Sequence, residues 1–594
     1  MPGPRSARGD LRRARDAKGT MLRLMGYLRP YALLLLLVVL MTLASSTFSV
    51  LQPSVTGDIT TALFEGATQG VFDWDHITAL LLTLVGFFVA SQALGALQGI
   101  IMTHVTTKVL QGLRDEIDQK VHRLPLDYYD SRTSGEILSV ITNDADMVDG
   151  AISRNLTQIV SQLIMVVGIF IMMMRISGWL TLIAVLMVPV SLVASLGVIK
   201  KSTGYFADQQ KQLGSLNGYI EELYDGQNVV QSFNYQQRAT ARFDELNTTL
   251  ATTARKASVA AGVVRPITST VTNLGYALSA ALGCLFALQG KIAVGDVQAM
   301  LSYSRQFSQP FTSIAAMAGS LAAAVAAAER VFDLLDATEQ VPDPIPGKVP
   351  ATNKGSVSFE HVRFGYSPDN QLMHDVNFSV EPGQKVAIVG PTGAGKTTLV
   401  NLLMRFYEVD GGSVLVDGVP TQQMTREELR RRFGMVLQDT WLFQGTVRDN
   451  LAYGREGATE EDIVRAAKAA SVDPIIRTMP GSYDMVLTSG AENVSQGERQ
   501  LLTIARALVA DPEIMILDEA TSNVDARTEQ LIQEAMAQLL VGRTSFVIAH
   551  RLSTIRDADK ILYMEHGDIL ETGTHDQLME LDGRYAALYN SQYA

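Results

Sequence analysis

The chain is poor in cysteine and in charge. Cys284 is the single cysteine among 594 residues, which excludes an internal disulfide and a cysteine-rich zinc site. Because Cys284 lies inside an apolar stretch, we expect a buried, unreactive thiol. Charged residues make up 19% of the chain and apolar residues 47%, whereas soluble proteins carry about 25% charged residues. This balance favours a membrane protein.

The sequence also lacks the basic excess of a nucleic-acid-binding protein. Its net charge is −12 at pH 7, whereas a nucleic-acid-binding domain presents a concentrated basic face, so we expect no nucleic-acid partner. The basic N-terminal region holds no short apolar core followed by a small-residue cleavage site, as a secretory signal would. We expect residues 1–20 to form a basic cytoplasmic tail near lipid headgroups.

Six stretches almost without Asp, Glu, Lys or Arg are long enough to cross a bilayer as helices, which takes about 20 apolar residues. They are Tyr31–Thr56, Ile77–Thr107, Asn155–Met174, Ile176–Ile199, Pro266–Gly290 and Val297–Ala328, the last interrupted by Arg305. The sequence therefore predicts an α-helical transmembrane domain of six helices over residues 21–336. Arg305 is expected either to reach the outer headgroups or to face the translocation cavity.

The placement of Lys and Arg predicts the orientation. Residues 57–76 contain no Lys or Arg, whereas residues 108–154 and 200–265 hold many. Basic residues are enriched on the cytoplasmic side, so both long segments and both termini are expected in the cytoplasm. The first long segment has one short break at Leu124–Tyr129, and the second has one at Tyr224–Gln227. This pattern predicts long helices that end in small tips. A separate loop domain is the alternative, but neither segment has enough apolar residues for its own core.

The composition changes at the proline-rich stretch Val341–Pro346, which predicts a linker over residues 337–354. Beyond it, short apolar runs alternate with amphipathic helical patterns. This alternation is typical of an α/β domain, which we place at residues 355–594.

The strongest motif of this second domain is the segment 390–397, Gly-Pro-Thr-Gly-Ala-Gly-Lys-Thr, which fits the G-x-x-x-x-G-K-[ST] phosphate-binding pattern. It follows an apolar strand pattern at 386–389 and precedes a helical one. Backbone N–H groups would converge on phosphate oxygens, Lys396 would neutralise the β- and γ-phosphates, and Thr397 would ligate Mg²⁺. ATP and Mg²⁺ are the predicted cofactors. The nucleotide-binding residues predicted here are Gly390, Thr392, Gly393, Gly395, Lys396, Thr397 and Thr398.

A second apolar strand pattern, at 514–517, ends in Asp518 and Glu519. An acid at the tip of a buried strand is suited to a nucleotide-bound Mg²⁺, so Asp518 is a predicted metal ligand. Glu519 would then polarise the attacking water.

Between these motifs, residues 494–500 read Val-Ser-Gln-Gly-Glu-Arg-Gln, which resembles the Leu-Ser-Gly-Gly-Gln signature of the ABC family of ATPases. The resemblance implies further roles. Tyr366 resembles the aromatic residue that stacks on adenine, and residues 522–525, ending at Asp525, resemble the loop that joins two ATPase domains. Gln438 resembles the glutamine that links Mg²⁺ and water to the transmembrane part, and His550 resembles the switch histidine at the γ-phosphate. The implied catalytic set is Glu519, His550 and Gln438, and the implied metal ligands are Thr397, Gln438 and Asp518.

The first half resembles the exporter branch of that family, whose half-transporters carry six helices ahead of one ATPase domain. The resemblance is carried by Ser134–Ile137, Thr142–Asp144, Gly295–Val297, Tyr303, Phe307 and Pro310. It implies a second half-transporter chain as partner. Each ATP would then lie between Lys396 of one chain and a signature segment of the other, formed by Ser495, Gln496 and Gly497.

Gln496 stands at a glycine position of the signature, and Glu498 replaces its final Gln. A side chain at 496 intrudes where only backbone should approach phosphate. Either the substitution is tolerated, or the signature serves a weakened site of a different partner chain. Heterodimeric exporters of bacteria have such a site, and a chain with Glu519 intact and Gln496 altered resembles their consensus subunit.

The resemblance implies ATP-driven export of amphipathic small molecules, drugs or lipids, by alternating access at a bacterial inner membrane. An importer built on the exporter fold, as for siderophores, and a homodimeric lipid flippase are the alternatives. A peptide-processing exporter would need an N-terminal cysteine protease, for which residues before Tyr31 hold neither room nor a cysteine. Membrane lipids and a small-molecule substrate are the other expected partners.

Overall fold

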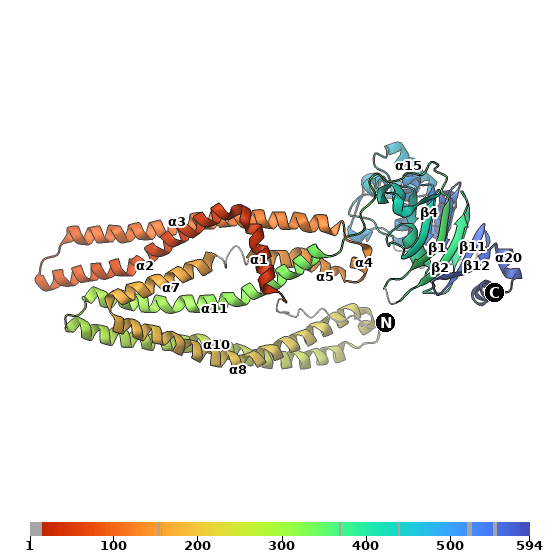
Figure 1. The fold of residues 1–594 in the computed structure, drawn as a ribbon. Coiled ribbons are helices and arrows are strands. Elements are labelled where there is room, and N and C mark those ends of the chain that lie inside the picture. The colour runs from red at the N-terminus through yellow and green to blue at the C-terminus, as the bar shows by residue number, and fades with distance from the viewer. Residues whose placement is uncertain are drawn as a thin grey trace. The chain divides into compact units, whose positions relative to one another are not determined.

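The computed structural model describes residues 15–150, 155, 157–367, 370–437, 440–518, 525–549 and 555–593. The chain divides into two compact units, Met1–His122 with Ser134–Ala337, and Arg123–Thr133 with Thr338–Ala594. The first unit is helical, and the second holds every strand of the described residues (Figure 1). The predicted catalytic residues Gln438, Glu519 and His550 lie outside the described residues.

Six long helices form the first unit in the described residues: α2 (Ala32–Gln69), α3 (Trp74–Val121), α7 (Thr157–Ile176), α8 (Gly178–Asp225), α10 (Gln236–Leu288) and α11 (Val294–Asp336). Shorter helices are α1 (Ala17–Leu28), α5 (Ser134–Ser139), α6 (Ala145–Gly150), α9 (Gln227–Ser232) and the π-helical turn η2 (Val140–Asp144). Among the described residues, five helical segments are long and apolar enough to cross a membrane, and α8 adds the apolar stretch Gly178–Ser191. The helical fold class is confirmed, and most of the helices continue well past the predicted spans.

The long helices pack pairwise, α2 along α3 and α8 along α10 (Figure 1). Two glycines let α2 and α11 approach closely, because a Cβ atom on Gly295 would meet the Gly57 carbonyl oxygen at 1.8 Å. Nearby, the hydroxyl of the fully buried Tyr303 donates to the Val50 carbonyl over 2.7 Å. Gly295 and Tyr303, which carry part of the resemblance to the exporter branch, therefore lie where α11 packs against α2.

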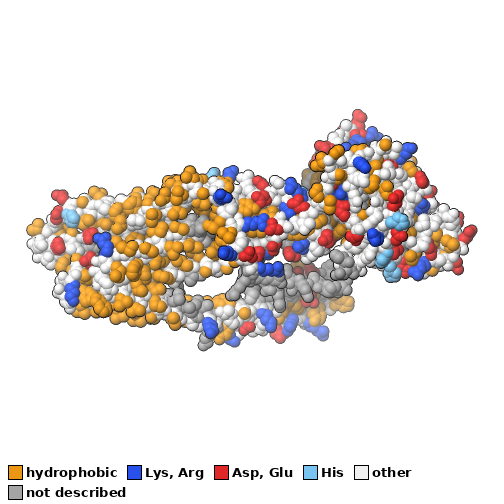
Figure 2. Space-filling model, viewed as in Figure 1, with side chains coloured by type: hydrophobic (Ala, Val, Ile, Leu, Met, Phe, Trp, Pro, Cys, Tyr) orange, Lys and Arg blue, Asp and Glu red, His pale blue; other side chains and the backbone are white. Residues whose placement is uncertain are grey.

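On the face shown in Figure 2, a broad belt of hydrophobic side chains covers much of the helical unit, and charged side chains of both signs lie at its two ends, more of them at one end. Cys284 is exposed on α10, so the prediction of a buried thiol is wrong. The apolar stretch around Cys284 does not require an interior position, because a helix that crosses a bilayer presents apolar side chains to lipid. Arg305 is also exposed, and its guanidinium lies 4.6 Å from the centre of the Tyr276 ring.

The second unit contains two main sheets. A six-stranded sheet has the order β12-β11-β3-β10-β9-β6, and a four-stranded sheet has the order β2-β1-β4-β5. The strands are β1 (Val357–Phe364), β2 (Met373–Val380), β3 (Lys385–Val389), β4 (Gly411–Val416), β5 (Val419–Pro420), β6 (Phe433–Val436), β7 (Gly445–Thr446), β8 (Val486–Leu487), β9 (Ile514–Asp518), β10 (Thr544–Ile548), β11 (Lys560–Glu565) and β12 (Asp568–Gly573). In the larger sheet all strands are parallel except β12.

The helices of this unit are α4 (Leu126–Asp130), α12 (Lys396–Leu403), α13 (Arg426–Arg431), α14 (Val447–Ala452), α15 (Glu460–Ala469), α16 (Asp473–Thr478), α17 (Gln496–Ala510), α18 (Ala526–Leu540), α20 (His575–Glu580) and α21 (Arg584–Tyr593). Successive strand residues point to opposite faces of a sheet. Ile514 and Ile516 of β9 accordingly join the core shared with β1, β2 and α12, whereas Met515 and Leu517 join the core under α17 and α18. The larger sheet is thus buried on both faces, as its continuous apolar strands predict.

Candidate nucleotide-binding site

The predicted site residues follow neighbouring parallel strands at one edge of the larger sheet. In the register of β3, β10 and β9, Ile548 pairs with both Ile388 and Asp518. The phosphate loop begins two residues after Ile388, and Glu519 and His550 follow Asp518 and Ile548 along the chain. The carboxyl ends of parallel strands are the usual place for ligands in such sheets.

The phosphate loop has the backbone geometry that its glycines permit. Gly393 and Gly395 have φ angles of +82° and +98°, a conformation that favours glycine. Gly395 caps α12, which begins at Lys396. The Gly567 N–H donates to the Ala394 carbonyl over 3.0 Å and fixes the loop from the β11–β12 turn. The predicted strand–loop–helix arrangement is present.

The Lys396 side chain lies over this loop. Its ammonium group donates to the carbonyl oxygens of Gly390 and Pro391, at 2.8 and 3.0 Å. Burial lowers the pKa of Lys396, and the carboxylate of Asp518 acts in the opposite direction. A phosphate group would replace the carbonyls as the partner of this cation and favour its charged form.

The loop has a donor set that suits Mg²⁺. Mg²⁺ in nucleotide sites is held by one or two carboxylates and by phosphate oxygens. The exposed Thr397 follows Lys396, and the half-buried Asp518 lies near enough to Lys396 to influence its pKa. No group of three His, Cys, Asp or Glu side chains that could hold a metal ion occurs among the described residues. The fit therefore depends on phosphate oxygens as further ligands.

Tyr366 lies at the start of α12. Its hydroxyl is 2.9 Å from the hydroxyl of Thr398, a buried residue of that helix. The Tyr366 side chain is 49% exposed, so the ring can be reached from solvent. The structure thus brings the predicted adenine-stacking residue and the phosphate loop together.

Ser495 caps α17 through a reciprocal pair of hydrogen bonds. Its hydroxyl accepts from the Glu498 N–H over 3.3 Å, and the Glu498 carboxylate accepts from the Ser495 N–H over 2.7 Å. Gln496 is exposed at the first helical position, and Gly497 is buried. The start of α17 already carries one carboxylate, which occupies the favourable field of the helix N-terminus.

Asp525 begins α18 as its capping residue. Its carboxylate accepts from the backbone N–H groups of Arg527 and Thr528, at 3.1 and 3.0 Å. Hydrogen bonding to Thr528 lowers the pKa of Asp525, which is ionised at neutral pH. Residues 522–524 of the predicted joining loop lie outside the described part of the chain.

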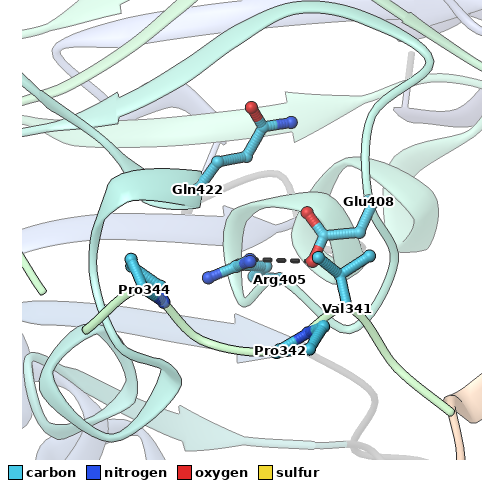
Figure 3. Close-up of a pocket in the computed structure, with 6 residues that line it drawn as sticks. All are labelled: Val341, Pro342, Pro344, Arg405, Glu408 and Gln422. Carbon is cyan, nitrogen blue, oxygen red and sulfur yellow. Dashed lines mark hydrogen bonds and ion pairs between the residues drawn. The ribbon is translucent and has the colours of Figure 1, made fainter.

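A cavity of about 360 Å³ lies elsewhere in the second unit (Figure 3). It is lined by Val341, Pro342, Pro344, Arg405, Glu408 and Gln422. Beside it, Asp343 of the predicted linker pairs with Arg426 at 2.6 Å, and Glu408 pairs with Arg405 and Arg426, each at 2.9 Å. No residue of the phosphate loop lines this cavity, so we assign it to linker attachment.

Sequence reasoning missed Tyr407, whose ring lies 5.2 Å from that of Tyr366, centre to centre. It also missed Gly567, where a Cβ atom would clash with the Leu372 carbonyl. Gly567 had a local signal, because it follows His566 in a short turn between apolar runs. Tyr407 had none, since its neighbours come from distant parts of the chain.

Comparison with known proteins extends this picture to the whole chain. A family model described as the ABC transporter transmembrane region matches residues 35–311, and one described as ABC transporter matches residues 373–522. The chain is 41% identical over 610 residues to the "Fatty acid ABC transporter ATP-binding/permease protein" of Mycobacterium tuberculosis (strain CDC 1551 / Oshkosh), covering 96% of each chain. It is 33% identical over 580 residues to the "ATP-dependent lipid A-core flippase" of Legionella pneumophila (strain Paris), again covering 96% of each.

Among solved structures, the chain resembles a bacterial Atm1-family ABC exporter with ATP bound. The TM-score is 0.72 at 29% sequence identity, over 96% of this chain and 99% of the other. Exporters of this kind act as dimers. The chain therefore belongs to the ABC transporter family, as an exporter half-transporter of a bacterial membrane that binds ATP and couples its hydrolysis to transport.

Proposed function

We propose that this chain exports amphipathic small molecules, drugs or lipids, by alternating access. The observation that carries the proposal is similarity over nearly the whole chain to two proteins named for fatty acid transport and lipid A-core flipping. The apolar belt on the helical unit suits a substrate that enters from lipid (Figure 2). The assignment divides the chain into a transmembrane domain over residues 21–336, a linker over 337–354 and a nucleotide-binding domain over 355–594.

In the proposed reaction, Lys396 and the loop N–H groups hold the β- and γ-phosphates of ATP. Thr397 and Asp518 would hold Mg²⁺, with Gln438 as a further ligand, and the ion would neutralise negative charge on the phosphates. Glu519 accepts a proton from the attacking water, and His550 stabilises the γ-phosphate. Adenine stacks on Tyr366, whose exposed ring leaves room for it.

The proposed partner is a second half-transporter, different from this chain. Its phosphate loop would face Ser495, Gln496 and Gly497 of this chain, where the exposed Gln496 side chain and the Glu498 carboxylate both disfavour a γ-phosphate. That site would be weak, whereas the site with Glu519 would hydrolyse ATP. A homodimeric lipid flippase is the second candidate, favoured by the lipid A-core relative.

The proposed location is the bacterial inner membrane, with both termini and the ATPase domain in the cytoplasm. The support is the distribution of Lys and Arg, which are absent from residues 57–76 and frequent in 108–154 and 200–265. An importer on the same fold would share this topology and differ only in the direction of transport.

The test is Mg-ATPase activity of the chain purified alone in lipid nanodiscs, with Glu519→Gln as control. A folded chain that binds ATP and hardly turns it over supports a different partner. Robust activity that Glu519→Gln abolishes would support the homodimer instead. Inside-out vesicles then test direction: ATP-dependent accumulation of a fluorescent fatty acid supports export, and ATP-dependent loss from loaded vesicles would show import.

A further inference from the structure

A short helix of the first predicted tip belongs to the same compact unit as the ATP-binding residues. It is α4, Leu126–Asp130, in the segment that follows α3 along the chain. Hydrogen bonds from distant parts of the chain reach this segment. The Gln340 N–H donates to the Arg123 carbonyl over 3.0 Å, and the Tyr407 hydroxyl donates to the Asp130 carboxylate.

Tyr407 also belongs to an aromatic cluster beside the nucleotide site. Its ring meets that of Tyr366 edge to face, at 5.2 Å and 88°, and that of Phe364 at 5.7 Å and 63°. Tyr366 meets Phe364 at 5.0 Å and 81°. Each ring therefore contacts the other two, so a change in the position of one ring alters its packing against both neighbours.

The cluster ends in a polar contact on each side. On one side the Tyr366 hydroxyl pairs with Thr398, the second residue after Lys396. On the other side Tyr407 reaches Asp130. Burial and the hydrogen bond to Asp130 raise the pKa of Tyr407, so its hydroxyl keeps its proton at neutral pH. The contacts thus run without a gap from the phosphate-loop helix to α4.

We infer that Tyr407 is a positioning residue that links occupancy of the nucleotide site to α4, through Tyr366 on one side and Asp130 on the other. The inference rests on the proposed function, because it needs adenine to stack on Tyr366. A base that packs against the exposed part of the Tyr366 ring changes the position of that ring. The Tyr407 ring moves with it because the two rings are in contact, and this movement changes the hydrogen bond from the Tyr407 hydroxyl to Asp130.

The test is hydrogen–deuterium exchange of the full chain in lipid nanodiscs, with and without ATP in the presence of EDTA, so that no hydrolysis is needed. In the wild type, ATP changes the exchange rate of amides in residues 123–133. Tyr407→Phe keeps the ring and removes only the hydroxyl. Loss of a hydrogen bond to a charged group alters a local equilibrium by about tenfold, so the ATP-dependent change should fall by about that factor while ATP affinity stays within about twofold.

Two further variants sharpen the result. Asp130→Ala, which removes the acceptor of the Tyr407 hydroxyl, should reproduce the effect of Tyr407→Phe, and the double variant should do no more than either single one. Tyr453→Phe removes the hydroxyl of an exposed tyrosine elsewhere in the unit, which is 68% exposed, and should leave the ATP-dependent change as in the wild type.

A role that is only structural gives a different pattern. Exchange in residues 123–133 would then rise equally with and without ATP in Tyr407→Phe, the ATP-dependent difference would persist, and the inference would be overturned. Retention of the difference in Asp130→Ala alone would equally overturn it. Absence of ATP binding in the wild type would overturn the proposed function together with this inference.

Discussion

Arg330 of α11 donates two hydrogen bonds to the Asp144 carboxylate, from Nε at 2.7 Å and from a terminal nitrogen at 2.5 Å. The Asp144 side chain is only 6% exposed, and it ends the π-helical turn η2. Two residues further on, Asp146 pairs with Arg114 at 2.6 Å, but both of these side chains are more than half exposed. The two aspartates are alike in chemistry and differ in burial.

Asp144→Ala should therefore destabilise the helical unit far more than Asp146→Ala. We expect a loss of about 2–3 kcal/mol for Asp144→Ala, because the buried end of η2 loses two hydrogen bonds to a charged group. For the exposed pair we expect at most about 1 kcal/mol. Thermal unfolding of the detergent-solubilised protein, followed by size-exclusion chromatography, measures both. Equal losses would show that burial of Asp144 contributes nothing.

ATP affinity should fall at alkaline pH because of Lys396. The pKa of this lysine lies below the ordinary 10.5 in the ATP-free loop, since burial disfavours its charge. Phosphate binds the charged form, so affinity is constant below the lowered pKa and falls as the pH rises through it, by up to about tenfold per pH unit. Lys396→Arg, which stays charged, should bind ATP without this dependence. Titration with a fluorescent ATP analogue from pH 7 to 10 checks the prediction.

Glu498→Gln should strengthen nucleotide binding at the site that this signature completes. The variant keeps the hydrogen bond to the Ser495 N–H, now 2.7 Å long, but removes a negative charge from the start of α17. We expect the Kd for ATP at that site, measured by equilibrium binding to the assembled transporter, to fall about twofold to fivefold. The matched control is Asp449→Asn, which alters the same kind of capping pair at α14. An unchanged Kd in Glu498→Gln would mean that this carboxylate does not oppose the γ-phosphate.

The linker contact beside the cavity in Figure 3 should stabilise the second unit. The Arg426 side chain is 10% exposed and pairs with Asp343 at 2.6 Å. Asp343→Ala should cost about 2–3 kcal/mol, because a buried cation loses a partner. Glu427→Ala, on the same helix, removes an exposed pair to Arg431 at 3.7 Å and should have no measurable effect. Denaturant unfolding followed by tryptophan fluorescence compares the two variants.

The features predicted correctly from the sequence are those that depend on residues adjacent in the chain. The phosphate loop could be predicted because its glycines, the preceding strand and the following helix are contiguous in sequence, and Gly395 has the positive φ that such a loop requires. The helix breaks at Leu124–Tyr129 and Tyr224–Gln227 are present for the same reason. The apolar strands β3 and β9 begin or end within one residue of their predicted limits.

Contacts between distant segments could not be predicted in this way. Asp343 and Arg426 are 83 residues apart in sequence, and Asp130 and Tyr407 are 277 apart. No periodicity or motif connects such residues, because their proximity depends on how whole elements pack. The wrong prediction of a buried Cys284 thiol has another origin. The mean hydropathy of a stretch indicates that a helix lies in a membrane, but it does not indicate which residues of that helix face the lipid.

The exposed position of Cys284 on α10 has a practical consequence. Since the chain holds one cysteine, a membrane-permeant spin label would attach at a single position per chain without any mutagenesis. Two labelled copies in one transporter would yield a spin–spin distance, whereas one labelled copy paired with an unlabelled second protein would yield none. A label at Cys284 would thus report whether one transporter contains one or two copies of this chain.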